Sequence, residues 1–230
     1  MPRPQLVVLS GAGISAESGI PTFRDADGLW EGHDIMEVAS PQGWNANPEL
    51  VLEFYNQRRK AALEASPNTG HKILASLEQY FEVTVITQNV DNLHESAGST
   101  RVIHLHGELF KSRSTIDSSL VYPIDGWELK LGDLCKKGSQ LRPHIVWFGE
   151  EVPMMEQATI ICNSADILVV VGTSLIVYPA AGLLNFVNSQ IPKYVINPNM
   201  PQIDPMPNLH LIHKGAGEGL TELKEILVKN

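Results

Sequence analysis

A short glycine-rich turn at the end of the first apolar segment limits the possible folds most strongly. Residues 5–10 have the pattern of a buried strand and run directly into Gly11, Gly13 and Ala16, which have the spacing G-x-G-x-x-A. Glycines at these places allow a tight turn and a close approach of the backbone to a pyrophosphate at a helix start. A strand-to-helix turn that needs only small residues would look the same. The pattern therefore favours a dinucleotide-binding fold, to be weighed with the rest of the chain.

The rest of the chain alternates between short β-branched runs and longer helical patterns. The expected strands are residues 5–10, 83–88, 166–173, 194–197 and 209–213, and the expected helices are residues 48–65, 70–80, 156–164, 180–189 and 219–229. Nearly continuous apolar strands that alternate with helices indicate a parallel sheet covered on both faces. We therefore predict an α/β protein with a Rossmann-like, doubly wound parallel sheet.

Two stretches interrupt this alternation. Residues 28–75 are helical and separate the first strand from the second, whereas residues 108–144 are polar and have no sustained period. We predict one domain over residues 1–230. Its Rossmann-like core comprises about residues 1–27, 76–107 and 145–230, with a helical insertion at about 28–75 and a small module at about 108–144.

Composition narrows the possible partners and the cellular compartment. The net charge of −9 gives no basic surface for nucleic acid and disfavours anionic membranes, whereas it would attract a basic peptide. The only cysteines, Cys135 and Cys162, imply no disulfide framework and suit a reducing cytosol. Neither the N-terminal apolar run nor residues 167–171 is long enough for a signal peptide or a membrane span. We expect a soluble, cytoplasmic monomer without nucleic-acid or membrane partners.

Polar residues follow the strand expected at residues 83–88. Gln88, Asn89 and Asp91 lie at its carboxyl end. Polar residues after a strand often only cap the next helix. The carboxyl ends of strands in open α/β sheets are, however, the place where ligands bind, and three polar groups together favour a functional site.

Two histidines in the segment 102–107 are candidates for proton transfer at neutral pH. His104 and His106 are two residues apart at a strand end, so strand alternation points them the same way and cannot choose between them. A histidine in such a run can also be a hydrogen-bonded structural residue.

The loop after the glycine turn carries several functional side chains. Thr22, Phe23 and Arg24 follow Pro21, where a plain dehydrogenase would continue as a helix. A stiff loop with an aromatic ring, a cation and a hydroxyl is suited to closing over a bound cofactor.

Six motifs together resemble the sirtuin family. They are residues 11–15 (GAGIS), 19–24 (GIPTFR), 87–94 (TQNVDNLH), 106–107 (HG), 145–150 (IVWFGE) and 172–174 (GTS). They occur in the order and at the spacing of that family, from residue 6 to about residue 220. One such motif could be a coincidence, but six in register are not.

The resemblance implies an NAD-dependent protein-lysine deacylase that transfers the acyl group to ADP-ribose and releases nicotinamide. NAD and an acyl-lysine protein or peptide would meet between the Rossmann-like core and the smaller module. His106 would be the catalytic base, which selects it over His104, and Asn89 would take part in catalysis.

The resemblance also implies the residues that bind each reactant. Those implied to bind NAD are Gly11, Ala12, Gly13, Ala16, Thr22, Phe23, Arg24, Gln88, Asn89, Asp91, Gly172, Thr173, Ser174, Asn197, Asn199 and Ala216. Among them, Phe23 resembles a lid beside the ribose and Asp91 the acceptor of the carboxamide. Val146, Phe148 and Gly149 would bind the substrate.

Tyr55 and Arg58 bear on the choice of acyl group. They are three residues apart on the helix expected at 48–65 and therefore share a face. A phenol and a guanidinium form a fork that can hold a carboxylate, although such a pair is also common on an ordinary helix surface. Their position resembles the sirtuin class that removes succinyl and malonyl groups. We expect acidic acyl groups to be accepted and acetyl groups to be removed as well.

The zinc site usual in sirtuins is expected to be missing. The family holds zinc on two Cys-x-x-Cys pairs, and the corresponding positions here are Ser114, Asp117, Cys135 and Gly138. Structural zinc needs four donors, and Ser and Gly do not supply them. The spacing of Asp117, Cys135 and His144 does not support a substitute site. We predict no metal, and we expect the small module to be held by packing of Leu120, Val121, Tyr122, Trp127 and Leu129.

Three other functions share parts of this pattern. A hydride-transferring dehydrogenase has the glycine motif but lacks the loop at 19–25 and the segment at 147–150, which we expect to be a strand. A silent binder of NAD or acyl peptide would not need His106, Asn89 and Asp91. A sirtuin-like protein ADP-ribosyltransferase would not need Tyr55 and Arg58.

Overall fold

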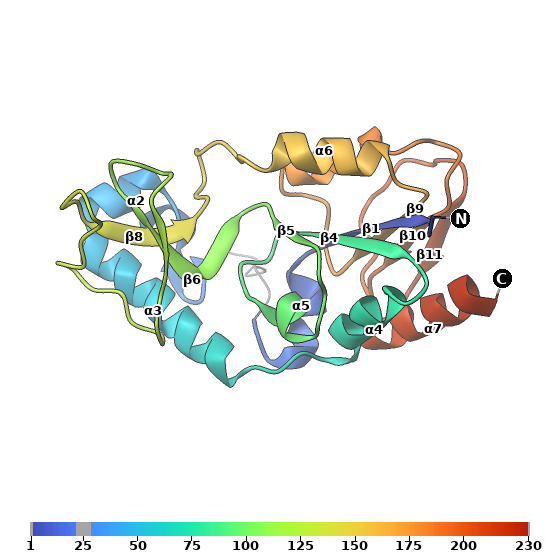
Figure 1. Ribbon diagram of the computed structural model, residues 1–230, viewed down its shortest axis with the longest axis horizontal. Helices are drawn as coiled ribbons and strands as arrows, with labels where there is room; N and C mark the ends of the chain where they lie inside the picture. Colours follow the sequence, from blue (N-terminus) through green and yellow to red (C-terminus); the bar gives the residue numbers. More distant parts are fainter. Residues whose placement is uncertain (1, 22–28, 230) are drawn as a thin grey trace.

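The computed structural model describes residues 2–21 and 29–229. Within these residues, the largest sheet has six parallel strands in the order β11-β10-β9-β1-β4-β5 (Figure 1). The strands are β1 (Gln5–Ser10), β4 (Glu82–Thr87), β5 (Val102–His104), β9 (Ile167–Val171), β10 (Lys193–Ile196) and β11 (Leu209–Ile212). The chain extends from β1 through β4 to β5, and then continues on the other side of β1. The predicted doubly wound α/β fold is confirmed, with its switch point beside β1.

Helices cover both faces of this sheet because β1 alternates two sets of apolar side chains. Leu6 and Val8 face α4 (Thr69–Leu77) and α7 (Ala216–Lys229), whereas Val7 and Leu9 face α6 (Met155–Asn163). Figure 1 shows α6 above the sheet and α4 and α7 below it. Full burial of one such side chain contributes about 1.5–3 kcal/mol, so the two apolar layers dominate the stability of the core.

The predicted helix at residues 180–189 is wrong in type and length. The segment is a 3-10 helix, η3 (Ala180–Phe186), with the Gly182 amide bonded to the Pro179 carbonyl at 3.0 Å. Gly182 in its middle weakens an α-helix. η3 nevertheless covers the sheet as expected, because Leu183 and Leu184 pack with Leu168 and Val170.

In its described part, the region predicted as a helical insertion contains a short hairpin, three helices and the start of α4. The hairpin is β2 (Leu29–Trp30) with β3 (His33–Asp34), and the helices are α1 (Ile35–Val38), α2 (Pro41–Ala46) and α3 (Pro48–Glu64). Asn47 begins α3 by accepting the Leu50 amide at 3.1 Å, ahead of Pro48. The described helices include none that is long and apolar enough to cross a membrane.

The small module is built around an antiparallel sheet that its polar sequence did not predict. The strands are β6 (Gly107–Ser114), β7 (Val121–Pro123) and β8 (Leu141–Ile145), in the order β7-β6-β8. Leu52 of α3 packs on Leu129, Cys135 and Leu141. Of the residues expected to pack the module, Leu120 and Tyr122 flank this cluster, whereas Val121 is exposed. The predicted domain boundaries stay predictions.

Two buried polar side chains of α3 attach the loop at residues 124–130. Arg59 is fully buried and donates to the carbonyl oxygens of Trp127 at 2.7 Å and Leu109 at 3.2 Å. Its guanidinium also donates to Asn56, which in turn exchanges two hydrogen bonds with the backbone of Leu129. Buried charge that is hydrogen-bonded in this way fixes one arrangement, because each partner left alone would be costly.

Candidate functional site

A cleft of about 600 Å³ lies at the carboxyl ends of β1, β4, β9 and β10 and faces the turn after β8. It collects residues from every predicted motif that the structure describes. The candidate residues on its wall are Gly11, Ala12, Gly13, Ala16, Tyr55, Gln88, Asn89, Asp91, His106, Val146, Phe148, Gly149, Gly172, Thr173, Ser174, Asn197, Asn199 and Ala216. Thr22, Phe23 and Arg24 lie outside the described residues, and Arg58 is not on the wall.

The floor of the cleft is a cradle of backbone formed by two glycine loops. The Gly13 amide donates to the Gly172 carbonyl at 2.8 Å, and a Cβ on Gly13 would lie 2.8 Å from the Gly172 Cα. Gly172 itself has φ +64. After the glycines the chain makes two 3-10 turns, η1 (Ala12–Ile14) and η2 (Ala16–Ser18), instead of a continuous helix. The glycines thus let the two loops pack backbone against backbone at the wall of the cleft, and main chain without side chains at this place suits the close approach of a pyrophosphate.

Ser15 joins the first loop to the loop after β4. Its Oγ donates to Asp91 Oδ2 at 3.0 Å and accepts from Asn89 Nδ2 at 3.0 Å. Asp91 Oδ1 accepts the Leu93 amide at 3.1 Å, so both carboxylate oxygens are fixed. Burial raises the pKa of Asp91 above its ordinary value, although the hydrogen bonds oppose this. Ser15 lies in the first motif, but the sequence alone assigns it no role; its buried position between Asn89 and Asp91 does.

His106 presents one basic nitrogen to the cleft. Its Nδ1 lies 3.1 Å from the Gln88 carbonyl oxygen, which can only accept, so Nδ1 carries the proton and Nε2 keeps its lone pair. Burial lowers the pKa of His106 below the ordinary 6.5, which keeps the ring neutral at pH 7. Gly107 has φ +87, and a Cβ there would collide with the His144 carbonyl, which explains the glycine after this histidine.

The prediction that His104 and His106 point the same way is wrong. Residues 105–106 form a turn between β5 and β6, so the two-residue alternation stops at His104. His104 Nδ1 lies 2.9 Å from the Asn89 carbonyl oxygen and Nε2 lies 2.7 Å from Glu95 Oε1. His106 alone of the two lines the cleft.

The segment at residues 147–150, expected as a strand, is a turn. The Glu150 amide donates to the Trp147 carbonyl at 3.0 Å, and Gly149 has φ +88, which a regular strand does not allow. Glu150 accepts from Arg142 at 2.7 Å, from Arg113 at 3.0 Å and from the Trp147 amide at 2.8 Å. The Glu150 carboxylate therefore helps to hold the turn that presents Val146, Phe148 and Gly149, together with the Phe148 amide, which donates to the Ala39 carbonyl at 3.0 Å.

Tyr55 and Arg58 differ in their access to the cleft. Tyr55 is buried at the cleft wall, and its hydroxyl accepts from Trp147 Nε1 at 3.1 Å. Arg58 lies 3.6 Å over the Phe54 ring centroid, donates to the Phe54 carbonyl at 2.8 Å and pairs with Glu31 at 3.4 Å. It also contacts Trp30, which lines the cleft.

Comparison with known proteins identifies the family. The Sir2 family model matches residues 11–179. The chain belongs to the Sir2 family. It is 54% identical over 226 residues to an NAD-dependent protein deacylase from Helicobacter pylori, with 97% of each chain covered. A solved Sir2 homologue in complex with NAD is 41% identical, with a TM-score of 0.87 and 99% and 90% of the two chains covered. Sir2 bound to acetylated peptide is 30% identical, with a TM-score of 0.80 and 99% and 95% covered.

The residues at the Sir2-family zinc positions do not fit that metal. Lys137 pairs with Asp117 at 2.8 Å, and the Lys137 amide lies 3.4 Å from Cys135 Sγ. Ser114 and Gly138 are not zinc ligands. Within residues 2–21 and 29–229, no three His, Cys, Asp or Glu side chains are grouped to hold a metal ion. The loss of zinc stays a prediction.

Proposed function

We propose that this Sir2-family chain is an NAD-dependent protein-lysine deacylase, and that it accepts succinyl and malonyl as well as acetyl groups. The observation that carries the proposal is the neutral His106, whose basic Nε2 shares one cleft with the Ser15, Asn89 and Asp91 cluster. A base and a set of fixed polar groups in one cleft suit a reaction between two bound partners.

The cleft fits NAD as a co-substrate. Gly11, Gly13 and Gly172 form a wall of the cleft without side chains, which the pyrophosphate can approach closely, and Asn197 and Ala216 lie on the side of β10 and α7, where the adenosine half would bind. Asn89 and Asp91 would contact the ribose and the nicotinamide carboxamide. Bound NAD supplies a ribose carbon that accepts the acyl oxygen as nicotinamide leaves.

The chain's own groups perform the positioning and the proton transfer. His106 Nε2 removes a proton from a ribose hydroxyl, and its Nδ1 stays bonded to the Gln88 carbonyl, which fixes the tautomer. The turn at residues 146–149, whose Val146 amide donates to the His106 carbonyl at 2.9 Å, holds the acyl-lysine beside this base and keeps water from the ribose carbon until nicotinamide has left. Overall, acyl-lysine, NAD and one water give unmodified lysine, nicotinamide and acyl-ADP-ribose, with the water breaking the bond between the acyl carbon and the lysine nitrogen after nicotinamide has left.

Two side chains support the acidic acyl groups. The Arg58 Nε is buried and has no hydrogen-bond partner among the described residues, so it keeps one unused donor for an anion, although Arg58 itself does not line the cleft. Its Glu31 partner is 36% exposed, so a substrate carboxylate would replace a contact already weakened by water. The Tyr55 hydroxyl accepts from Trp147 and can still donate its own proton.

A product assay tests the function and its alternatives together. The protein is incubated with NAD and with acetyl-, succinyl- or malonyl-lysine peptides of one sequence, and all products are identified by mass spectrometry. We expect nicotinamide release matched to deacylation. Reduced cofactor would mean a dehydrogenase, a peptide carrying ADP-ribose would mean a transferase, and no turnover would mean a binder.

The acyl preference is tested by an internal ratio. Losing a charge-assisted contact to a buried carboxylate costs about 2–5 kcal/mol, so Arg58→Met should lower desuccinylation far more than deacetylation. Tyr55→Phe should act in the same direction and more weakly. Lys60→Met, on the exposed side of α3, is the matched control. A succinyl-to-acetyl ratio that stays constant in Arg58→Met would contradict the acidic-acyl assignment.

A further inference from the structure

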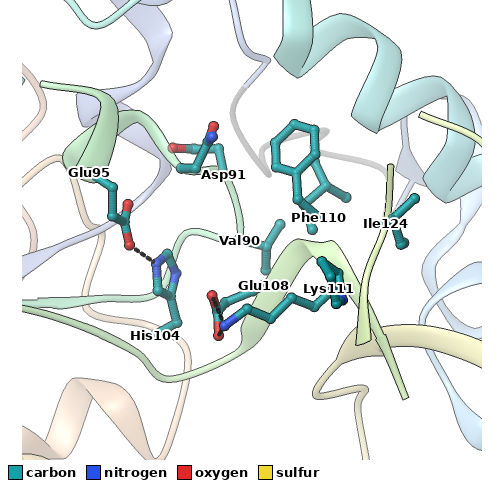
Figure 2. Close-up of a pocket in the computed structure, with 11 residues that line it drawn as sticks. Val90, Asp91, Glu95, His104, Glu108, Phe110, Lys111 and Ile124 are labelled. Atoms are coloured by element: carbon teal, nitrogen blue, oxygen red, sulfur yellow. Dashed lines mark hydrogen bonds and ion pairs between the residues drawn. The ribbon is translucent and has the colours of Figure 1, made fainter. Parts of the chain in front are cut away.

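A second cavity of about 300 Å³ lies behind the loop that forms one wall of the cleft. Asp91 and Val90 line both cavities, so the loop at residues 88–92 is a thin partition between them. Figure 2 shows His104 and Glu95 on one side of this second cavity and the pair Glu108 and Lys111 below it. The proposed reaction uses none of these four side chains.

Three consecutive carbonyl groups of the partition are each held by one donor. The Gln88 carbonyl accepts from His106 at 3.1 Å, the Asn89 carbonyl from His104 at 2.9 Å, and the Val90 carbonyl from the Leu109 amide at 2.8 Å. His106 acts from the cleft side and the other two act from the β5 and β6 side. The positions of Asn89 and Asp91 therefore depend on contacts behind the cleft as well as within it.

His104 is placed between two acceptors. Its Nδ1 faces the Asn89 carbonyl oxygen and its Nε2 faces the Glu95 carboxylate at 2.7 Å. A neutral imidazole has one N–H and can satisfy only one of them, whereas the imidazolium ion donates to both. The ring is 8% exposed and Glu95 is 42% exposed, so the pair is shielded on the ring side only.

The surrounding charges favour the imidazolium ion. Burial alone would lower the pKa of His104, but the hydrogen bond and charge of Glu95 outweigh it and raise the pKa above 6.5. The other groups that face the ring are Asp91 on the loop, His94 on α5 (Leu93–Ser96), and Glu108 on β6, which pairs with Lys111. His94 is held neutral because burial lowers its pKa to about 3.

We propose that His104, held as an imidazolium ion by Glu95, is a positioning residue that fixes Asn89 and Asp91 from behind the cleft and makes catalysis depend on its protonation. Loss of the proton at alkaline pH removes one of its two hydrogen bonds and frees the Asn89 carbonyl. The inference rests on the proposed deacylase function. The pH profile of the activity then has an acid limb, because His106 must lose its proton, and an alkaline limb, because His104 must keep its second proton.

The test is a pH profile of kcat and of kcat/KM for deacylation. Glu95→Gln keeps an oxygen acceptor but removes the charge, so the alkaline midpoint should fall by roughly 1 unit, the shift typical of losing one close opposite charge. The acid limb, set by His106, should not move. The matched control is Glu108→Gln, which lines the same cavity but contributes less to the raised pKa of His104 than Glu95 does; it should lower the alkaline midpoint by clearly less than Glu95→Gln. His104→Gln should abolish that alkaline limb.

A direct titration keeps this inference separate from the proposed function. The ¹⁵N resonances of the His104 ring are followed in the full chain without substrate, in wild type and in Glu95→Gln. We expect both nitrogens to be protonated at pH 7 in wild type, with the midpoint lowered in the variant. If the titration is as expected but no deacylation is found, the proposed function is wrong, whereas the imidazolium form of His104 still stands. A neutral His104 at pH 7, or an alkaline limb unchanged in Glu95→Gln, would overturn the inference.

Discussion

The two halves of the cleft are held by different forces. The glycine cradle rests on a parallel sheet whose strands are buried by many apolar side chains, such as Val8, Val169 and Leu183. The turn at residues 146–150 belongs to the small-module side, where a few buried polar groups fix the backbone, above all Arg59 and Glu150. Apolar burial is spread over many contacts, whereas removal of one buried polar partner leaves the others unpaired. A single substitution in the parallel sheet should therefore lower the stability of the whole molecule, whereas one on the small-module side should disturb only its surroundings.

The largest expected effect is a loss of catalytic rate without a loss of stability, after substitution of His106. His106→Ala removes the base but leaves the cradle intact, so kcat should fall about 10²–10⁴-fold, the usual contribution of a general base. NAD affinity by calorimetry and the melting temperature should stay close to wild type. Unchanged steady-state turnover in the variant would remove His106 from the reaction.

The next prediction compares the loss of a buried polar residue, Arg59, with the loss of a buried apolar residue, Leu183. Arg59→Met leaves the carbonyls of Trp127 and Leu109 unpaired, at about 1–3 kcal/mol for each buried group. Leu183→Ala opens a cavity in the core and should cost about 2–5 kcal/mol. Hydrogen exchange should show the loss of protection confined to β6 and residues 124–130 in Arg59→Met, but spread over the parallel sheet in Leu183→Ala. An equal loss of protection throughout the molecule in both variants would contradict the difference between the two sides of the cleft.

A smaller effect should appear at the turn that presents the substrate. Glu150→Gln keeps the shape but weakens the bonds to Arg142 and Arg113, so KM for the acyl peptide should rise severalfold while KM for NAD changes little. Burial alone would raise the pKa of Glu150, but the hydrogen bonds from Arg142 and the Trp147 amide lower it below 4.5. Its stabilising contribution is thus present above pH 4.5 and is lost as the pH falls through the lowered pKa. Acid unfolding of Glu150→Gln should lack this component, and an equal rise in both KM values would contradict the assignment.

The smallest effect should come from metal removal. If the small module is held by Arg59, Asn56 and packing, chelator should leave the melting temperature unchanged, and tag-free protein should contain well below one zinc per chain. Because the Asp117 and Lys137 pair is exposed to water, Lys137→Met should also leave the melting temperature unchanged. Stoichiometric zinc by elemental analysis would show that Asp117 and Cys135 belong to a site after all.

Sequence reasoning succeeded where apolar periodicity carries the information. The buried strands beginning near Gln5 and Ile167 are nearly continuous apolar runs, so the sheet and the strand ends that form the cleft could be predicted. It failed where a turn breaks the period. The turn at residues 105–106 separates His104 from His106, and Gly149 converts an expected strand into a turn.

Buried polar contacts could not be predicted from the hydrophobic periodicity either. Arg59 is next to Arg58 in sequence, yet Arg59 is the fully buried anchor and was not singled out. Ser15, Arg113 and Arg142 likewise gain their importance from partners far along the chain, which no local pattern records. The antiparallel sheet of the small module could not be predicted because β6 carries several polar side chains and β7 has only three residues.

The most direct test of the account is the stoichiometry of a single turnover with a limiting acyl-lysine peptide. Peptide, nicotinamide and the ADP-ribose product are separated and quantified in wild type and in His106→Ala. The account predicts one nicotinamide and one acylated ADP-ribose for each lysine freed in wild type, and at least ~10²-fold slower formation of the acylated product in the variant. Lysine freed without consumption of NAD, or NAD converted to its reduced form, would contradict it.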